Sequence, residues 1–123
     1  KKGYIVAINL MQISEKSEKD ILTAANQAQR VKPDILYFAD SLGSMNEQKI
    51  KKIIISLRKF WKGELGIHAH NNLGKALSNS LFALENGVTW VDSTVTGMGR
   101  GPGNVQTEFL LLEMEKYLIT LLI

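Results

Sequence analysis

Hydrophobic and polar residues follow one another along this chain in blocks that predict four strands, each followed by a helix. Four short apolar runs, rich in β-branched and aromatic residues, are typical of buried strands and cover residues 4–11, 35–39, 65–69 and 89–95. After each run, apolar residues recur at helical spacing, over residues 17–31, 46–61, 73–85 and 105–117. Ser17, with Asp20 three positions later, is an acidic variant of a capping box and predicts the start of the first helix.

This repeated order predicts an α/β fold in which right-handed strand–helix–strand units build one parallel sheet. We expect a single domain over residues 1–123, because a chain of this length and ordinary globular composition has room for one small core. A closed (β/α)8 barrel takes roughly 250 residues, so the chain is either an open four-stranded sheet or half of such a barrel. Lys1 lies almost at the start of a strand, which favours a truncated barrel.

Composition narrows the class of partner. Without cysteine the chain has neither disulfides nor thiolate metal ligands, which fits a reducing cytoplasm. No apolar run is long enough to cross a membrane. Much of the net charge of +3 comes from bases between Lys49 and Lys62, which form either a nucleic-acid patch or the solvated face of an amphipathic helix. No aromatic residues alternate with these bases as a stacking platform requires, so we expect neither a nucleic-acid nor a membrane partner.

Polar residues gather where each predicted strand ends. They are Asn9, Asp40 with Ser41, His68 with His70, and the glycine-rich loop from Gly97 to Asn104. Ligands bind at the carboxyl ends of strands in parallel α/β folds. The pattern therefore predicts one shared site at that edge of the sheet.

The two histidines, the only ones in the chain, are the strongest candidates in this set. Side chains alternate along a strand, so His68 and His70 point to the same face. They are either two half-buried histidines bonded to backbone groups or two ligands of a divalent metal, and Asn71 and Asn72 after them favour the metal. Two imidazoles alone leave such an ion short of ligands, so oxygen donors must come from elsewhere.

Each of the other candidates has a plain structural alternative. Asp40 is either a turn residue or a carboxylate that bonds a metal-bound water or a substrate hydroxyl. Arg100 pairs with a substrate carboxylate or is a solvated loop base, and Asn9 faces either a ligand or a buried partner. In the loop, Gly99 and Gly101 let the backbone approach a ligand closely. A dinucleotide site is disfavoured, because proline occupies the position of the third glycine in the fingerprint.

Three motifs stand in order at successive strand ends: Ala39-Asp40-Ser41-Leu42-Gly43, His68-Ala69-His70-Asn71-Asn72-Leu73-Gly74 and Gly97-Met98-Gly99-Arg100-Gly101-Pro102-Gly103-Asn104. Together they resemble the HMG-CoA lyase-like superfamily of DRE-type metallolyases, whose catalytic domains are TIM barrels. The superfamily includes 4-hydroxy-2-oxovalerate aldolase, HMG-CoA lyase, isopropylmalate and homocitrate synthases, and the carboxyltransferase domain of pyruvate carboxylase. The resemblance covers the whole chain as about strands four to seven, the C-terminal half of the barrel.

This resemblance implies a site and a reaction. His68, His70 and Asn104 match metal ligands, for Mn²⁺ or Mg²⁺ with Zn²⁺ as an alternative, and Asp40 with Ser41 matches the acidic motif beside the metal. We expect Asp40 and Arg100 to take part in catalysis. We expect substrate contacts from Asn9, Ser41, Gly99 and Gly101. In the superfamily the ion binds a 2-oxo acid or its enolate and stabilises the charge that develops as a carbon–carbon bond breaks or forms.

Within the superfamily, the residues after the second histidine and the glycine loop are closest to the pyruvate aldolases. These cleave a 4-hydroxy-2-oxo acid to pyruvate and an aldehyde. A synthase that joins a 2-oxo acid to an acyl-CoA is the second reading, and a non-catalytic module that binds an anion through the glycine loop is a third. The superfamily's Asp-Arg-Glu segment is absent, so we expect a missing N-terminal half to complete the site. We also expect the open sheet edges to favour association.

Overall fold

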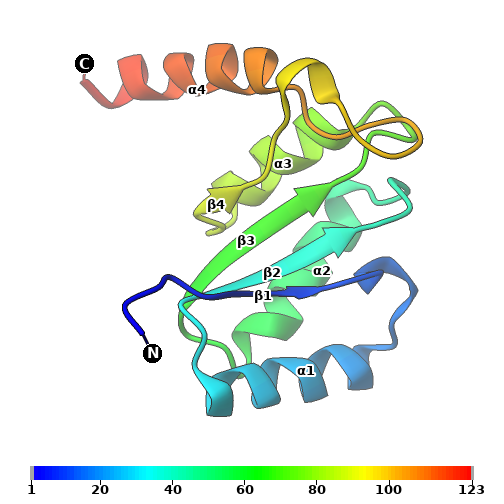
Figure 1. Cartoon of the computed structure of the whole chain (residues 1–123), viewed down its shortest axis with the longest axis vertical. Helices are drawn as coiled ribbons and strands as arrows, with labels where there is room; N and C mark the ends of the chain where they lie inside the picture. The colour runs from blue at the N-terminus through cyan, green and yellow to red at the C-terminus, as the bar shows by residue number, and fades with distance from the viewer. Residues whose placement is uncertain (1, 123) are drawn as a thin grey trace.

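The structure, a computed structural model that describes residues 2–122, with side chains through Lys116, contains the predicted parallel sheet (Figure 1). Its strands, in the order β1-β2-β3-β4, are β1 (Ala7–Leu10), β2 (Ile35–Asp40), β3 (Glu64–Ala69) and β4 (Trp90–Val91). The helices are α1 (Glu18–Val31), α2 (Glu47–Arg58), α3 (Ala76–Glu85) and α4 (Thr107–Leu122), with 3-10 turns η1 (Ile13–Glu15) and η2 (Val95–Gly97). All three strand pairs are parallel, which confirms the predicted strand–helix order.

The core lies on one face of the sheet. Alternate residues of the central strands are fully buried against the helices: Leu36 and Phe38 from β2, Leu65 and Ile67 from β3. Helix α2 covers them with its apolar stripe, which is the buried side of the helix predicted to be amphipathic: Ile50, Ile53, Ile54 and Leu57. Since side chains alternate along each strand, the residues between these point to the opposite face, which carries the histidines.

The first helix begins where the sequence predicts. The Ser17 side chain accepts a hydrogen bond from the Asp20 amide at 3.2 Å, and the Asp20 carboxylate accepts one from the Ser17 amide at 3.3 Å. This reciprocal box satisfies amides that the helix itself leaves unpaired. At the start of α2, the Asn46 side chain accepts a hydrogen bond from the Lys49 amide at 2.9 Å.

Several predicted elements differ from the structure. Helix α2 ends at Arg58 rather than near residue 61, and α4 covers Thr107–Leu122 rather than 105–117. The run from residue 4 to 11 is not a buried strand: β1 is four residues long, and Tyr4 and Ile5 are 75% and 72% exposed, because β1 lies at the edge of the sheet. The fourth strand has two residues, since the chain leaves the sheet after Val91. Helix α3 begins at Ala76 rather than Leu73, and Asn79 and Ser80 are more deeply buried than its leucines.

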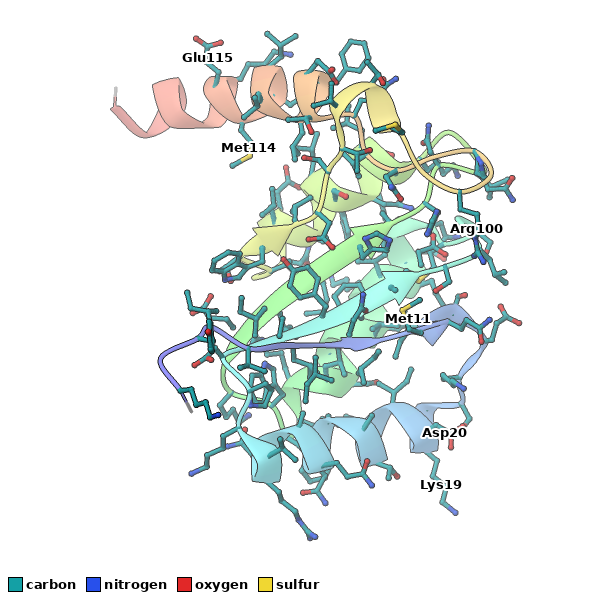
Figure 2. All side chains as sticks on the ribbon, viewed as in Figure 1. Met11, Lys19, Asp20, Arg100, Met114 and Glu115 are labelled. Atoms are coloured by element: carbon teal, nitrogen blue, oxygen red, sulfur yellow. The ribbon has the colours of Figure 1, made fainter. Side chains whose placement is uncertain are left out.

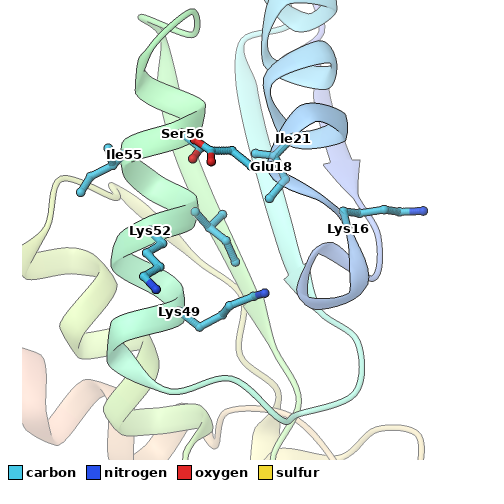
Figure 3. A pocket seen from close by; sticks show the side chains of 8 residues that line it. Lys16, Glu18, Ile21, Lys49, Lys52, Ile55 and Ser56 are labelled. Carbon is cyan, nitrogen blue, oxygen red and sulfur yellow. The ribbon is translucent and has the colours of Figure 1, made fainter.

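A hollow of about 390 Å³ opens between α1 and α2, on the helical side of the molecule (Figure 3). It is lined by Lys16, Lys49 and Lys52 together with Glu18, whose carboxylate is 2.9 Å from Lys59 Nζ. None of the residues predicted to form the site borders it. Within residues 2–122, no helix combines the length and the apolar character needed to cross a membrane.

Candidate metal centre

The predicted site residues come together at the carboxyl ends of the strands. His68 is the penultimate residue of β3, and His70 follows the strand and forms a backbone bridge with Asn104. The two imidazole rings lie edge to face, with their centroids 5.1 Å apart. The strand therefore brings both rings to one face, as its period of two predicts.

The glycine-rich loop folds back to bring Asn104 beside the histidines. The Asn104 amide donates to the Gly97 carbonyl at 3.0 Å, and the Asn71 amide donates to the Gly103 carbonyl at 2.9 Å. Gly103 has a φ of +84°, and a Cβ there would collide with the Gly97 carbonyl oxygen, so only glycine fits. The loop is thus tied to the segment that follows the histidines.

Asn104 presents an oxygen that no group in the described part of the chain satisfies. Its Nδ2 donates to the Met98 carbonyl at 3.2 Å, whereas its Oδ1 is buried and has no hydrogen-bond partner. A buried polar atom without a partner costs free energy. A cation bound beside the histidines would remove this cost.

Electrostatics favour the neutral form of His70. Burial lowers the pKa of its imidazole below the usual value of 6.5, and the neighbouring His68 and Arg100 add to this, while a backbone hydrogen bond with Gly103 and the charge of Asp40 oppose it. Neutral imidazole is the form that binds metals. The His70 imidazole therefore binds a proton less tightly in the folded chain than in the unfolded chain. Its contribution to stability is fully present above about pH 6.5 and is lost as the pH falls.

Asp92 and Tyr37 lie close to the histidines, and the sequence pattern singled out neither of them. Asp92 Oδ2 lies 3.0 Å from His68 Nδ1. Burial raises the pKa of the Tyr37 phenol to about 12, helped by the charge of Asp92 and a side-chain hydrogen bond with it. Asp92 follows the fourth strand at the same edge as the histidines, and that position is the signal that would have found it. Tyr37, inside an apolar run, carries no such signal.

Asp40 is placed differently from the histidines. It is 1% exposed, and its carboxylate accepts hydrogen bonds from the backbone amides of Ser44, at 3.1 Å, and Met45, at 2.9 Å. Ser41 is also engaged, since its hydroxyl accepts from the Gln12 amide at 2.9 Å. These contacts match the turn role that the sequence left open, and the catalytic and substrate roles of the two residues stay predictions.

The remaining candidates are exposed around the histidines. Arg100 lies on the glycine loop near the strand ends (Figure 2), and its charge contributes to the lowered pKa of His70. Gly99 is packed against the Asn104 side chain, whereas a Cβ at Gly101 would meet open space. Asn9 is exposed and pairs with Tyr37 in the sheet, on the face that carries the histidines.

The donors present fit part of the shell of a divalent metal. Two imidazoles and the unpartnered amide oxygen of Asn104 are groups that such ions accept. Among residues 2–122, however, no group of three or more His, Cys, Asp or Glu side chains is arranged to hold a metal. A divalent ion held by these three groups alone would be short of ligands.

Comparisons with known proteins identify a family for this chain. A family model described as HMGL-like matches residues 1–121. A 4-hydroxy-2-oxovalerate aldolase of Geobacillus genomosp. 3 is 37% identical over 107 residues, 87% of this chain and 32% of the relative. An oxaloacetate decarboxylase of Mycobacterium tuberculosis is 35% identical over 116 residues, 94% of this chain and 34% of the relative. The chain thus spans about a third of the length of these relatives.

The fold of this chain is also similar to that of a solved structure. The HMG-CoA lyase of Bacillus subtilis superimposes with a TM-score of 0.81 at 20% identity, covering 89% of this chain and 41% of that one. At this identity the likeness establishes the fold alone. The four strands and four helices correspond to part of a TIM barrel, which confirms the predicted fold class.

Proposed function

This chain belongs to the HMGL-like family, and we propose that it is part of a divalent-metal-dependent aldolase that cleaves a 4-hydroxy-2-oxo acid to pyruvate and an aldehyde. The observation that carries the proposal is the pair of neighbouring imidazoles at the carboxyl edge of the sheet, with Asn104 paired to the backbone of His70. The buried, unpartnered Oδ1 of Asn104 supports a cation at this position.

His68, His70 and Asn104 would hold the metal, Mn²⁺ or Mg²⁺ in our proposal, with Zn²⁺ as an alternative. When bound, such an ion stabilises negative charge that develops on a 2-oxo acid as its carbon–carbon bond breaks. The chain's own groups prepare the site for this. The depressed pKa of His70 keeps its imidazole neutral, and the glycine loop fixes Asn104 beside it.

The substrate would lie against the exposed face of the sheet. We propose that Arg100 pairs with its carboxylate, and that Asn9, Gly99 and Gly101 face it from the strand and the loop. Arg100 is exposed and close enough to His70 to lower the pKa of that imidazole. A substrate carboxylate bound there would neutralise the charge of Arg100. For Asp40 and Ser41 we propose a supporting role at the site, through the turn that their side chains hold.

A second candidate reaction is the decarboxylation of oxaloacetate. The relative from Mycobacterium tuberculosis named for this activity matches 94% of the chain at 35% identity. Loss of carbon dioxide from oxaloacetate leaves the enolate of pyruvate, and so does the retro-aldol cleavage of a 4-hydroxy-2-oxo acid. One set of charge-stabilising groups suits both reactions, and turnover of the two substrates by the full-length protein would separate them.

Metal titration of the full-length protein with Mn²⁺ tests the proposal. His68→Ala is expected to weaken Mn²⁺ binding at least tenfold and to abolish cleavage of 4-hydroxy-2-oxovalerate, because it removes one of two imidazole ligands. Gly101→Ala is the matched control for Mn²⁺ binding only, since a methyl group there meets open space and Gly101 is proposed to face the substrate rather than the metal. Equal Mn²⁺ affinity in both variants would contradict a metal role for the histidines.

We also propose that the site is completed by the part of the barrel that this chain does not include, because the donors among residues 2–122 are too few. The purified 123-residue chain is therefore expected to show no appreciable cleavage of a 4-hydroxy-2-oxo acid and weak Mn²⁺ binding. Edge strand β1, with Tyr4 and Ile5 exposed, should promote self-association of this chain. Sedimentation measures the self-association, and an assay for pyruvate measures the cleavage. Turnover by the isolated chain would contradict the proposal.

A further inference from the structure

The contact between Asp92 and His68 fixes which nitrogen of the imidazole is free. Asp92 Oδ2 lies 3.0 Å from Nδ1 of His68. An ionised carboxylate only accepts hydrogen bonds, so in the neutral imidazole Nδ1 carries the hydrogen and Nε2 keeps its lone pair. The free histidine side chain favours the opposite tautomer in water, so the contact selects a form that solvent alone would not.

Asp92 is itself held from the neighbouring part of the sheet. Tyr37 on β2 lies close enough to Asp92 for the carboxylate to help burial raise the pKa of the Tyr37 phenol to about 12. The Tyr37 ring rests on Gly66, its partner across β2 and β3. A Cβ at Gly66 would lie 2.5 Å from ring carbons of Tyr37, so the bare backbone of Gly66 is what leaves room for the ring.

We propose that Asp92 is a positioning residue that presents Nε2 of His68 to the metal, and that Tyr37, seated on Gly66, holds Asp92 in place. The inference rests on the proposed function, because it takes His68 as a metal ligand. It goes beyond the metal ligands themselves, because residues of β2, β3 and the segment after β4 together set the tautomer and orientation of His68. A carboxylate behind a metal-binding imidazole also raises its basicity.

The tautomer of His68 is measured directly by nitrogen NMR of the ¹⁵N-histidine-labelled full-length protein, without metal, at about pH 8.5. The wild-type protein is expected to hold His68 in the Nδ1–H form. Asp92→Ala should shift His68 towards the Nε2–H form. Glu115→Gln is the matched control, because it removes an exposed carboxylate on α4, away from the sheet (Figure 2).

Tyr37→Phe tests the second link with less risk to the fold, because only a hydroxyl is lost. It should loosen Asp92 and shift His68 part of the way to the Nε2–H form. Ultraviolet titration of tyrosine in the wild-type chain should show one phenol ionising at about pH 12. Asp92→Ala should lower that transition in part, because it removes the contribution of the carboxylate but leaves the larger one from burial. An unchanged transition in Asp92→Ala would overturn the link between Tyr37 and Asp92.

Two readouts separate this inference from the proposed function. An Nε2–H form of His68 in the wild-type protein, or an Nδ1–H form that survives in Asp92→Ala, overturns the positioning role whatever the metal does. In the full-length protein, Mn²⁺ affinity is expected to fall 10- to 100-fold in Asp92→Ala. Loss of affinity in His68→Ala but not in Asp92→Ala overturns the positioning role. Unchanged affinity in both variants overturns the proposed function itself.

Discussion

Replacing Asp40 by alanine is expected to lower the free energy of unfolding by about 3 kcal/mol, because hydrogen bonds to a charged group contribute roughly 1.5–3 kcal/mol each. The Asp40 carboxylate is 1% exposed and accepts two backbone amides, those of Ser44 and Met45. Alanine would leave both amides without this partner. Chemical denaturation of the variant and the wild-type chain, followed by circular dichroism, measures the difference.

Asp20→Ala is the matched control for Asp40→Ala. Its carboxylate also accepts a backbone amide, that of Ser17, but at an exposed helix start, so the expected loss is much smaller than that of Asp40→Ala. The comparison isolates the effect of burial. If Asp40→Ala unfolds like the wild-type chain while the full-length variant loses turnover, the carboxylate serves the chemistry rather than the turn.

Gly103→Ala is expected to displace the glycine loop and to destabilise the chain by about 3 kcal/mol, at the upper end of the roughly 1–3 kcal/mol cost of a strained backbone position. Gly103 has a φ of +84°, and the added methyl would collide with the Gly97 carbonyl oxygen. That collision is with backbone, which no rotamer change relieves. In the full-length protein the displacement should carry Asn104 away from the histidines and weaken Mn²⁺ binding at least tenfold.

Gly101→Ala provides the comparison within the same loop. Gly101 also has a positive φ, +61°, but nothing lies within 4 Å of the added Cβ. Its cost is therefore the left-handed backbone alone, about 1–2 kcal/mol. Thermal unfolding and Mn²⁺ titration of the two variants separate strain from collision. Equal effects of the two substitutions would show that the packing of Gly103 against Gly97 does not hold the loop.

The order of elements was predictable because it depends on local pattern. Helix α2 followed from apolar residues such as Ile50 and Leu57 at helical spacing, and the start of α1 from the Ser17 and Asp20 pair. Burial of β1 was not predictable in the same way. The run from residue 4 to 11 that contains β1 is apolar, like a central strand, yet Tyr4 and Ile5 before β1 are exposed, because burial depends on which elements lie beside a strand.

By itself, the sequence determined that His68, His70 and the glycine loop meet at one edge of a parallel sheet, because strand period and strand direction decide this without any knowledge of packing. Tertiary structure decided which atoms are free there. It left the Asn104 Oδ1 without a partner, tied the Asp40 carboxylate to a turn, and set Asp92 against His68. These outcomes depend on register between strands and on how loops close, and hydrophobic periodicity carries no information on either.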